Sequence, residues 1–386
     1  MLCCGALVGA TALVAQDGTK AEPAKAESKV EKAAYDPAAV PADLPGLLEY
    51  VKQGENWQPP VDPAMRRDPE AMKKIRDQIK TARGKLVEAT DKALALKPEE
   101  QNRVQLTKAK LNALRLMGMF GDEQADKTFE TLIDSLLKDK NPALSGDAYK
   151  LSLMIRLNRI MSGKGGESPD KLAAELSTAL DKDETRAEAV MVAQNATYMF
   201  EMKGHTELAR KLYDDLIKAA PKLDDSRMRT QVQKRAEGGI ARLGLIGRPA
   251  ELKGKLLDGA DFDVTSLKGK VVLIDFWATW CGPCIAEMPN VVENYKKYHD
   301  KGFEVVGVSI DDDKEKLETF VKEKDVQWRT LFNPDEATRG FENPSAKAYF
   351  VNGIPATYLV DKSGNITAIN VRGERLGELL ESLLGK

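Results

Sequence analysis

Cysteine and histidine are scarce in this sequence. The 386 residues include four cysteines and two histidines: Cys3, Cys4, Cys281, Cys284, His205 and His299. Structural zinc usually takes four such ligands, and the sequence offers no second pair with zinc-type spacing to complete a site at Cys281 and Cys284. A purely structural disulfide between these two cysteines is also disfavoured, because so short a loop constrains the unfolded chain little. The scarcity therefore favours a redox pair.

An excess of charge of either sign is also absent. Lys and Arg number 58 against 60 Asp and Glu, a formal net charge of −2, and the basic residues are not concentrated on one face. Nothing in the composition therefore points to nucleic-acid binding. Aromatic residues make up only 6% of the chain while helix formers are plentiful, so much of the chain should be α-helical. The length suggests two or three domains.

The first 15 residues lack any basic residue and form a short apolar segment, MLCCGALVGATALVA. The segment is too short to span a bilayer, and it resembles the apolar region of a secretory signal cleaved after Ala15. We therefore expect a protein that is exported, or tethered to a membrane through its N-terminus. Cleavage would remove Cys3 and Cys4, whereas lipid attachment at one of them is the alternative.

Residues 16–60 predict a linker. The first part is a tract of Ala, Lys and Glu with too few large apolar side chains to bury a core. The second part is rich in proline, and its residues 44–51, LPGLLEYV, form a candidate docking segment.

Residues 61–248 predict an all-α domain, because apolar residues recur at helical spacing, for example over residues 129–137. Breaks at Pro98, Pro142 and Pro169 divide it into about six or seven helices, which we expect to form antiparallel hairpins. Residues 204–221 resemble one helix of a tetratricopeptide-like hairpin, although no repeat recurs at a fixed period. Such an array would present a surface to a protein partner; a spacer or dimerisation domain is the alternative.

The chemistry is concentrated in FWATWCGPC, residues 276–284. The apolar run over residues 271–277 predicts a strand buried on both faces, and a helical pattern begins near Cys284. A helix that starts directly after a strand presents unpaired N–H groups and the positive end of its dipole. We therefore expect the pKa of the Cys281 thiol to be lowered and Cys281 to be the nucleophile. Cys284, one turn along the same face, can form a disulfide with Cys281 and release a bound partner.

This stretch and two further motifs resemble the thioredoxin superfamily and, more specifically, the bacterial extracytoplasmic TlpA-type thiol–disulfide oxidoreductases. The matching segments are KGKVVLIDFWATWCGPC (268–284), CIAEMP (284–289) and GIPAT (353–357). The resemblance covers about residues 251–386. It implies a thioredoxin-like α/β domain over residues 249–386, with a central mixed sheet flanked by helices, preceded by the all-α helical-hairpin domain.

The patterns within this region agree with that fold. We predict a hairpin over residues 252–264 with Asp258-Gly259 at its turn, and further strands at 303–310, 328–333, 357–361 and 365–371. Helices are predicted at 284–299, 313–324, 344–350 and 374–384. The strand–helix–strand unit from 271 to 310 implies a parallel pair with a right-handed crossover.

Two acids are candidates to take the proton of Cys284. Asp275 is the only charge in its apolar run, so burial should raise its pKa and make it a base; the alternative is an ordinary strand-end acid that reaches water. Glu287 lies three residues past Cys284 on the same helix face. The resemblance implies that it tunes the cysteines, and the alternative is a solvated helix residue.

The remaining candidates would bind substrate. Gly282 lets a partner approach closely, Pro283 removes a backbone donor, and Trp280 stands beside the pair. The resemblance implies that Pro355 follows a cis peptide bond and that Ile354 offers its backbone to an extended substrate peptide.

The Cys-Gly-Pro-Cys sequence is that of thioredoxin, a reducing protein, so we predict a reductase of disulfides in bacterial extracytoplasmic proteins. The resemblance implies cysteine-containing substrate proteins, a membrane thiol donor, and no cofactor or metal besides the Cys281–Cys284 disulfide. Three alternatives remain: a disulfide oxidase or isomerase, a thiol peroxidase, and a redox-regulated protein-binding module. The peroxidase is weakened because Thr279 stands only two residues before Cys281 and the proline of the peroxidase motif is absent.

Overall fold

A computed structural model describes residues 35–62, 65, 68–163, 166–324 and 326–385. The predicted signal-like segment, Cys3 and Cys4, and the predicted linker up to residue 34 lie outside these residues. The chain divides into two compact units, the first ending at Ser152 and the second beginning at Leu153. Within the described part of the chain, no helix combines the length and the apolar character that crossing a membrane requires.

The first unit is helical. It contains α1 (Leu44–Gly54), α2 (Pro69–Ala95), α3 (Glu100–Met119), α4 (Glu123–Leu136) and the first half of α5 (Pro142–Met161). Helix α1 lies in the stretch that we predicted to be a linker. Its apolar face, with Leu47, Tyr50 and Val51, is buried against Leu86 of α2 and Leu106 of α3. Burial of this face makes that part of the stretch a packed helix.

The second unit begins with the rest of α5, followed by α6 (Pro169–Asp181), α7 (Arg186–Lys203), α8 (Thr206–Ala219) and α9 (Ser226–Leu243). Eight helices, α2 to α9, therefore occupy the described residues of the predicted all-α region, where we expected six or seven. Some helix starts are marked only by a capping aspartate, such as Asp122 before α4 and Asp225 before α9. Apolar periodicity does not register such short breaks, which is why the count was low.

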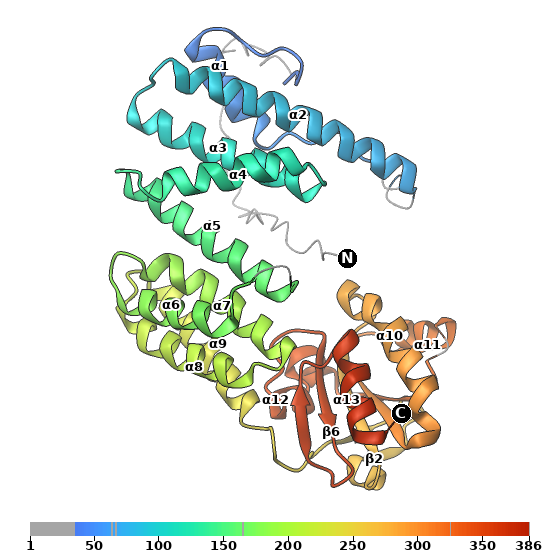
Figure 1. The fold of residues 1–386 in the computed structure, drawn as a ribbon. Coiled ribbons are helices and arrows are strands. Elements are labelled where there is room, and N and C mark those ends of the chain that lie inside the picture. The colour runs from blue at the N-terminus through green and yellow to red at the C-terminus, as the bar shows by residue number, and fades with distance from the viewer. Residues whose placement is uncertain (1–34, 63–64, 66–67, 164–165, 325, 386) are drawn as a thin grey trace, which may run out of the picture. The chain divides into compact units, whose positions relative to one another are not determined.

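The same unit continues as an α/β fold (Figure 1). The strands are β1 (Lys253–Lys255), β2 (Asp261–Asp263), β3 (Val271–Trp277), β4 (Phe303–Ser309), β5 (Arg329–Phe332), β6 (Ala356–Val360) and β7 (Ile366–Ile369). The helices are α10 (Gly282–Tyr298), α11 (Lys314–Glu323), α12 (Pro344–Ala348) and α13 (Glu374–Leu384). All the elements predicted for this region are present, with bounds that differ by at most two residues.

The sheet has the order β5-β4-β3-β6-β7. Strands β3, β4 and β5 are parallel, whereas β6 runs antiparallel to β3 and to β7. Strands β1 and β2 form a separate antiparallel hairpin. This mixed sheet, flanked by helices and preceded by a helical region, confirms the predicted thioredoxin-like fold class.

Strand β3 lies in the middle of the sheet and buries both faces. Val271 and Leu273 pack in one cluster with Tyr298 of α10 and Leu376 of α13, while Phe276 contacts Tyr349 and Tyr358. Because side chains alternate along a strand, Asp275 points to the same face as Val271 and Leu273. Asp275 is thus a carboxylate on the face that α10 covers.

A buried ionic cluster joins the later helices to this sheet. Glu201 of α7 is fully buried, and its carboxylate accepts from Arg242 of α9 at 2.7 Å and from Asn370, just after β7, at 2.6 Å. Arg375 of α13 donates to the backbone carbonyl of Glu201 at 3.1 Å. These hydrogen bonds join helices that precede residue 248 to segments that follow residue 249. We predicted a domain boundary between residues 248 and 249, and this position lies inside the second compact unit.

Candidate active site

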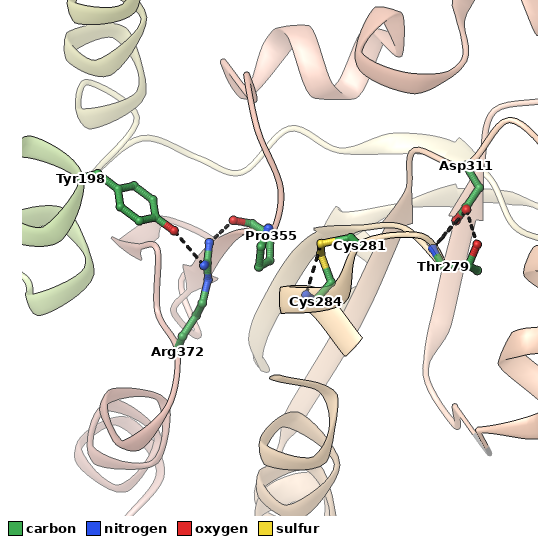
Figure 2. The surroundings of a disulfide bond; sticks show 7 residues. All are labelled: Tyr198, Thr279, Cys281, Cys284, Asp311, Pro355 and Arg372. Carbon is green, nitrogen blue, oxygen red and sulfur yellow. Dashed lines mark hydrogen bonds between the residues drawn. A yellow bond between two sulfur atoms is a disulfide. The ribbon is translucent and has the colours of Figure 1, made fainter. Parts of the chain in front are cut away.

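The two cysteines lie where β3 gives way to α10. Cys281 is the N-cap residue of α10, and its Sγ accepts from the backbone N–H of Cys284 at 3.2 Å. A disulfide joins the two side chains (Figure 2), and each cysteine is 5% exposed. The sulfur of Cys281 therefore occupies the place where the free N–H groups of a helix favour an anion.

The turn before Cys281 is held by a buried acid that the sequence reasoning missed. Asp311 follows β4, and its carboxylate accepts from the backbone N–H of Thr279 at 3.1 Å and from the Thr279 hydroxyl at 2.6 Å (Figure 2). Ser309 donates to its other oxygen at 2.8 Å. The signal for Asp311 is a Ser-Ile-Asp run at the end of a buried strand, which by itself does not distinguish a buried acid from an exposed one.

The cis-proline loop lies beside the disulfide in Figure 2. The Ile354–Pro355 peptide bond is cis, as the resemblance predicts. Ile354 packs against the cluster that contains both cysteines. The predicted loop lies just before β6 and the predicted pair just after β3, so the antiparallel pairing of these two strands brings them together.

The outer side of the pair is open. Trp280 is 60% exposed, while Trp277 in β3 is buried. Gly282 and Pro283 are exposed at the start of α10, and a Cβ built on Gly282 would meet none of the described atoms within 4 Å. Among the described residues of the second unit, the side of the pair with Trp280, Gly282 and Pro283 is therefore open to a partner chain.

The two candidate proton acceptors have different surroundings. Burial raises the pKa of Asp275 to about 7, with Arg372 opposing that rise and Glu287 adding to it. Its Oδ1 is buried, and no hydrogen-bond partner for it is found among the described residues. Glu287 is half-buried, and its Oε1 accepts from Asn290 at 2.6 Å and from the backbone N–H of Gly373 at 2.8 Å. Asp275 thus has free acceptor capacity, whereas one oxygen of Glu287 already receives two donors.

Arg372 and Tyr198 also belong to this neighbourhood, and sequence reasoning missed both. Arg372 lies between β7 and α13, and its guanidinium donates to the carbonyl oxygen of Pro355 and to the hydroxyl of Tyr198 in α7, the latter at 3.0 Å (Figure 2). An arginine in a short connection, and a tyrosine in a distant helix, carry no sequence signal of a shared site.

The described residues include no group of three or more His, Cys, Asp or Glu side chains placed to hold a metal ion. The chemistry that this arrangement supports on its own is exchange between the cysteine pair and another disulfide or dithiol.

Comparison with known proteins agrees with that chemistry. Residues 246–382 match the Redoxin family model. The chain is 34% identical over 130 residues to a thiol-disulfide oxidoreductase ResA of Bacillus cereus, covering 34% of this chain and 70% of that protein. It is 32% identical over 147 residues to the ResA of Oceanobacillus iheyensis, covering 38% of this chain and 72% of that protein.

Solved structures of similar sequence include the thioredoxin domain of a thiol-disulfide oxidoreductase from Bacteroides vulgatus. It is 29% identical, covers 35% of this chain and 94% of that chain, and superposes with a TM-score of 0.33. The family model lies over the segment that contains the cysteine pair. Through this C-terminal segment, the chain belongs to the ResA-type thiol–disulfide oxidoreductases with a redoxin domain.

Proposed function

We propose that the protein is a reductase of disulfides in extracytoplasmic bacterial proteins, with Cys281 and Cys284 as its redox pair. The observation that carries the proposal is the position of Cys281 as the N-cap of α10, with its sulfur accepting from the Cys284 N–H. A thiolate gains stabilisation at that place, and the thiolate is the reactive form of cysteine. The Gly-Pro dipeptide between the cysteines is that of a reducing pair.

The reaction begins with the reduced pair. The Cys281 thiolate attacks one sulfur of a substrate disulfide, so a mixed disulfide forms and the other substrate sulfur leaves as a thiolate that takes a proton. Cys284 then loses its proton and attacks Sγ of Cys281. This breaks the mixed disulfide and releases the second substrate sulfur as a thiolate, which is also protonated. The substrate gains two electrons and two protons, and the protein is left with the Cys281–Cys284 disulfide.

Asp275 is our candidate for the base that takes the Cys284 proton. Its pKa of about 7 lies near neutral pH, which suits a group that both accepts and returns a proton. Glu287 is the second candidate, and its engaged oxygen makes it the weaker one.

The substrate segment would lie across the open side of the pair. Trp280, Gly282 and Pro283 line that side, and the backbone of Ile354 would pair with an extended substrate chain next to the cis bond at Pro355. A membrane thiol donor would then return two electrons to the disulfide, and export or membrane tethering would come from the N-terminal segment. The helical region would present a surface to a protein partner.

The reduction potential of the Cys281–Cys284 pair tests the direction of electron flow. It is measured on the full chain in a dithiothreitol or glutathione redox series. A value near about −250 mV or lower, in the range of thioredoxin, supports the reductase. A value of about −120 to −180 mV would make the protein an oxidase or isomerase instead.

Single cysteine variants test the roles within the pair. Cys284→Ser should accumulate a mixed disulfide with a substrate protein, because the resolving thiol is missing, whereas Cys281→Ser should form none. Alkylation and non-reducing electrophoresis distinguish the two. Trapping by Cys281→Ser alone would reverse the assignment of attacking and resolving cysteine.

A further inference from the structure

Arg372 makes hydrogen bonds to two parts of the fold, and the proposed reaction does not explain either of them. Its guanidinium donates to the Pro355 carbonyl in the cis-proline loop and to the Tyr198 hydroxyl in α7. Its Nε is buried, and within the described residues it has no hydrogen-bond partner. A cation held in this way is costly unless negative charge lies nearby.

Asp275 supplies such a charge when it is ionised. Arg372 is the cation that favours the ionised form of Asp275, against burial and against the charge of Glu287. These are the charged groups that act on Asp275: Arg372 from the connection before α13 and Glu287 from α10. In the reduced protein, the Cys281 thiolate would add a second negative charge from the start of α10.

The connection that carries Arg372 is itself firmly held. The backbone N–H of Gly373 donates to Glu287 at 2.8 Å. On the other side, the Thr357 hydroxyl donates to the carbonyl of Val371 at 2.9 Å. The backbone is thus held on both sides of Arg372. The direction of the Arg372 side chain then depends on its hydrogen bonds to Pro355 and Tyr198.

We propose that Arg372 is a positioning residue for the disulfide exchange: it holds the cis-proline loop by the Pro355 carbonyl, acts on Asp275 through its charge, and is itself oriented by Tyr198 of α7. This role rests on the proposed function of the Cys281–Cys284 pair. It makes the helical region a contributor to the redox site through one hydroxyl group. Arg372 keeps the Asp275 carboxylate ionised, and therefore able to take the proton of Cys284, down to a lower pH.

The test is the pH dependence of a single turnover. Pre-reduced full-length protein is mixed with oxidised insulin, and insulin thiols are measured after acid quench from pH 5 to pH 9. The rate should rise with pH as Asp275 ionises. Arg372→Gln should move the midpoint upward by about one pH unit, since an opposite charge near an acid typically shifts its pKa by about one to three units. Arg372→Lys should move it by less than half as much, because the charge is kept.

Tyr198→Phe removes only the hydroxyl at a partly exposed position. It should move the midpoint in the same direction by a few tenths of a unit, and it keeps the proposal testable even where Arg372→Gln fails to fold. Arg375→Gln is the matched control. Arg375 also joins this segment to α7, by donating to the carbonyls of Glu201 and Met202, but it does not act on Asp275. It should lower stability and leave the midpoint unchanged.

The proposal would be overturned if the pH midpoints of the single-turnover rate in Arg372→Gln and Tyr198→Phe coincided with the wild-type value. An equal shift in Arg375→Gln would also overturn it, because that would show a general effect of loosening α7. A wild-type protein that reduces no insulin at any pH would instead refute the proposed function.

Discussion

Two carboxylates of the second unit, one fully buried and one half-buried with one buried oxygen, have opposite surroundings. Glu201 in α7 is fully buried, and its oxygens accept from Arg242, Tyr213 and Asn370 at 2.6–2.8 Å. Asp275 in β3 has a buried oxygen for which the described part of the chain provides no donor. The first acid is satisfied by its neighbours, and the second is left able to accept a proton.

The difference shows that burial alone does not define the role of an acid. A buried carboxylate that has all its hydrogen-bond partners holds neighbouring elements together. Glu201 holds α7, α9 and the segment after β7 together in this way. A buried acid with an unfilled oxygen and a pKa raised to about 7 is typical of a proton-transfer group.

The largest effect on stability should come from Glu201→Gln. The variant leaves the Arg242 guanidinium buried without its counter-charge, so we expect a loss of about 3 kcal/mol in the free energy of unfolding. Urea unfolding followed by circular dichroism measures it. Asp181→Asn is the control, because its ion pair with Lys222 is exposed and should contribute little to the free energy of unfolding. Equal losses in the two variants would show that the Glu201 cluster has no special role.

Asp275→Asn should affect the reaction instead. Losing a proton acceptor typically costs about 100-fold in rate, so we expect a fall of that size in single-turnover reduction at pH 7, with the mixed disulfide accumulating. Glu287→Gln provides the comparison and should cost less than about tenfold, because Glu287 already accepts from Asn290 and Gly373. A larger loss in Glu287→Gln would make Glu287 the principal acceptor.

The stability of the oxidised protein should also depend on Asp275. Its folded-state pKa of about 7 lies above the ordinary 3.8, so the folded state holds a proton that the unfolded chain releases between these values. The resulting stabilisation is fully present below about pH 4 and is lost as pH rises through about 7. The part lost between about pH 5.5 and pH 8 amounts to about 2 kcal/mol.

Urea unfolding of the wild-type protein and of Asp275→Asn at pH 4, 5.5 and 8 measures this dependence. The variant should become the more stable of the two as pH rises. A constant difference between them across this range would show that Asp275 has an ordinary pKa.

The smallest effect should arise on the open side of the site. Trp280 is 60% exposed, so Trp280→Ala should leave the unfolding free energy unchanged and raise KM for a protein disulfide by about three- to tenfold at constant kcat. Steady-state reduction of insulin measures both constants. If kcat fell by about three- to tenfold instead, Trp280 would act in the chemical step rather than in binding.

Much of this site was predictable because its signals are local. A seven-residue apolar run followed by Cys-Gly-Pro-Cys predicts a strand, a helix start and a redox pair, and β3 and α10 follow that prediction closely. The cis bond before Pro355 was predicted by resemblance to a family motif. The number of helices before residue 245 was not, because short turns capped by one aspartate interrupt no apolar pattern.

The sequence by itself identified the candidate cysteine pair, the succession of strands and helices along the C-terminal segment and the family, since these depend on periodicity and on motifs of adjacent residues. Only the tertiary structure decided which buried acid is satisfied and which is free, because donors reach Glu201 from α8, α9 and the segment after β7. It also decided that α7 touches the site: Tyr198 and Arg372 are 174 positions apart in the chain. No local pattern encodes a contact between residues so far apart, and packing brings them within hydrogen-bond distance.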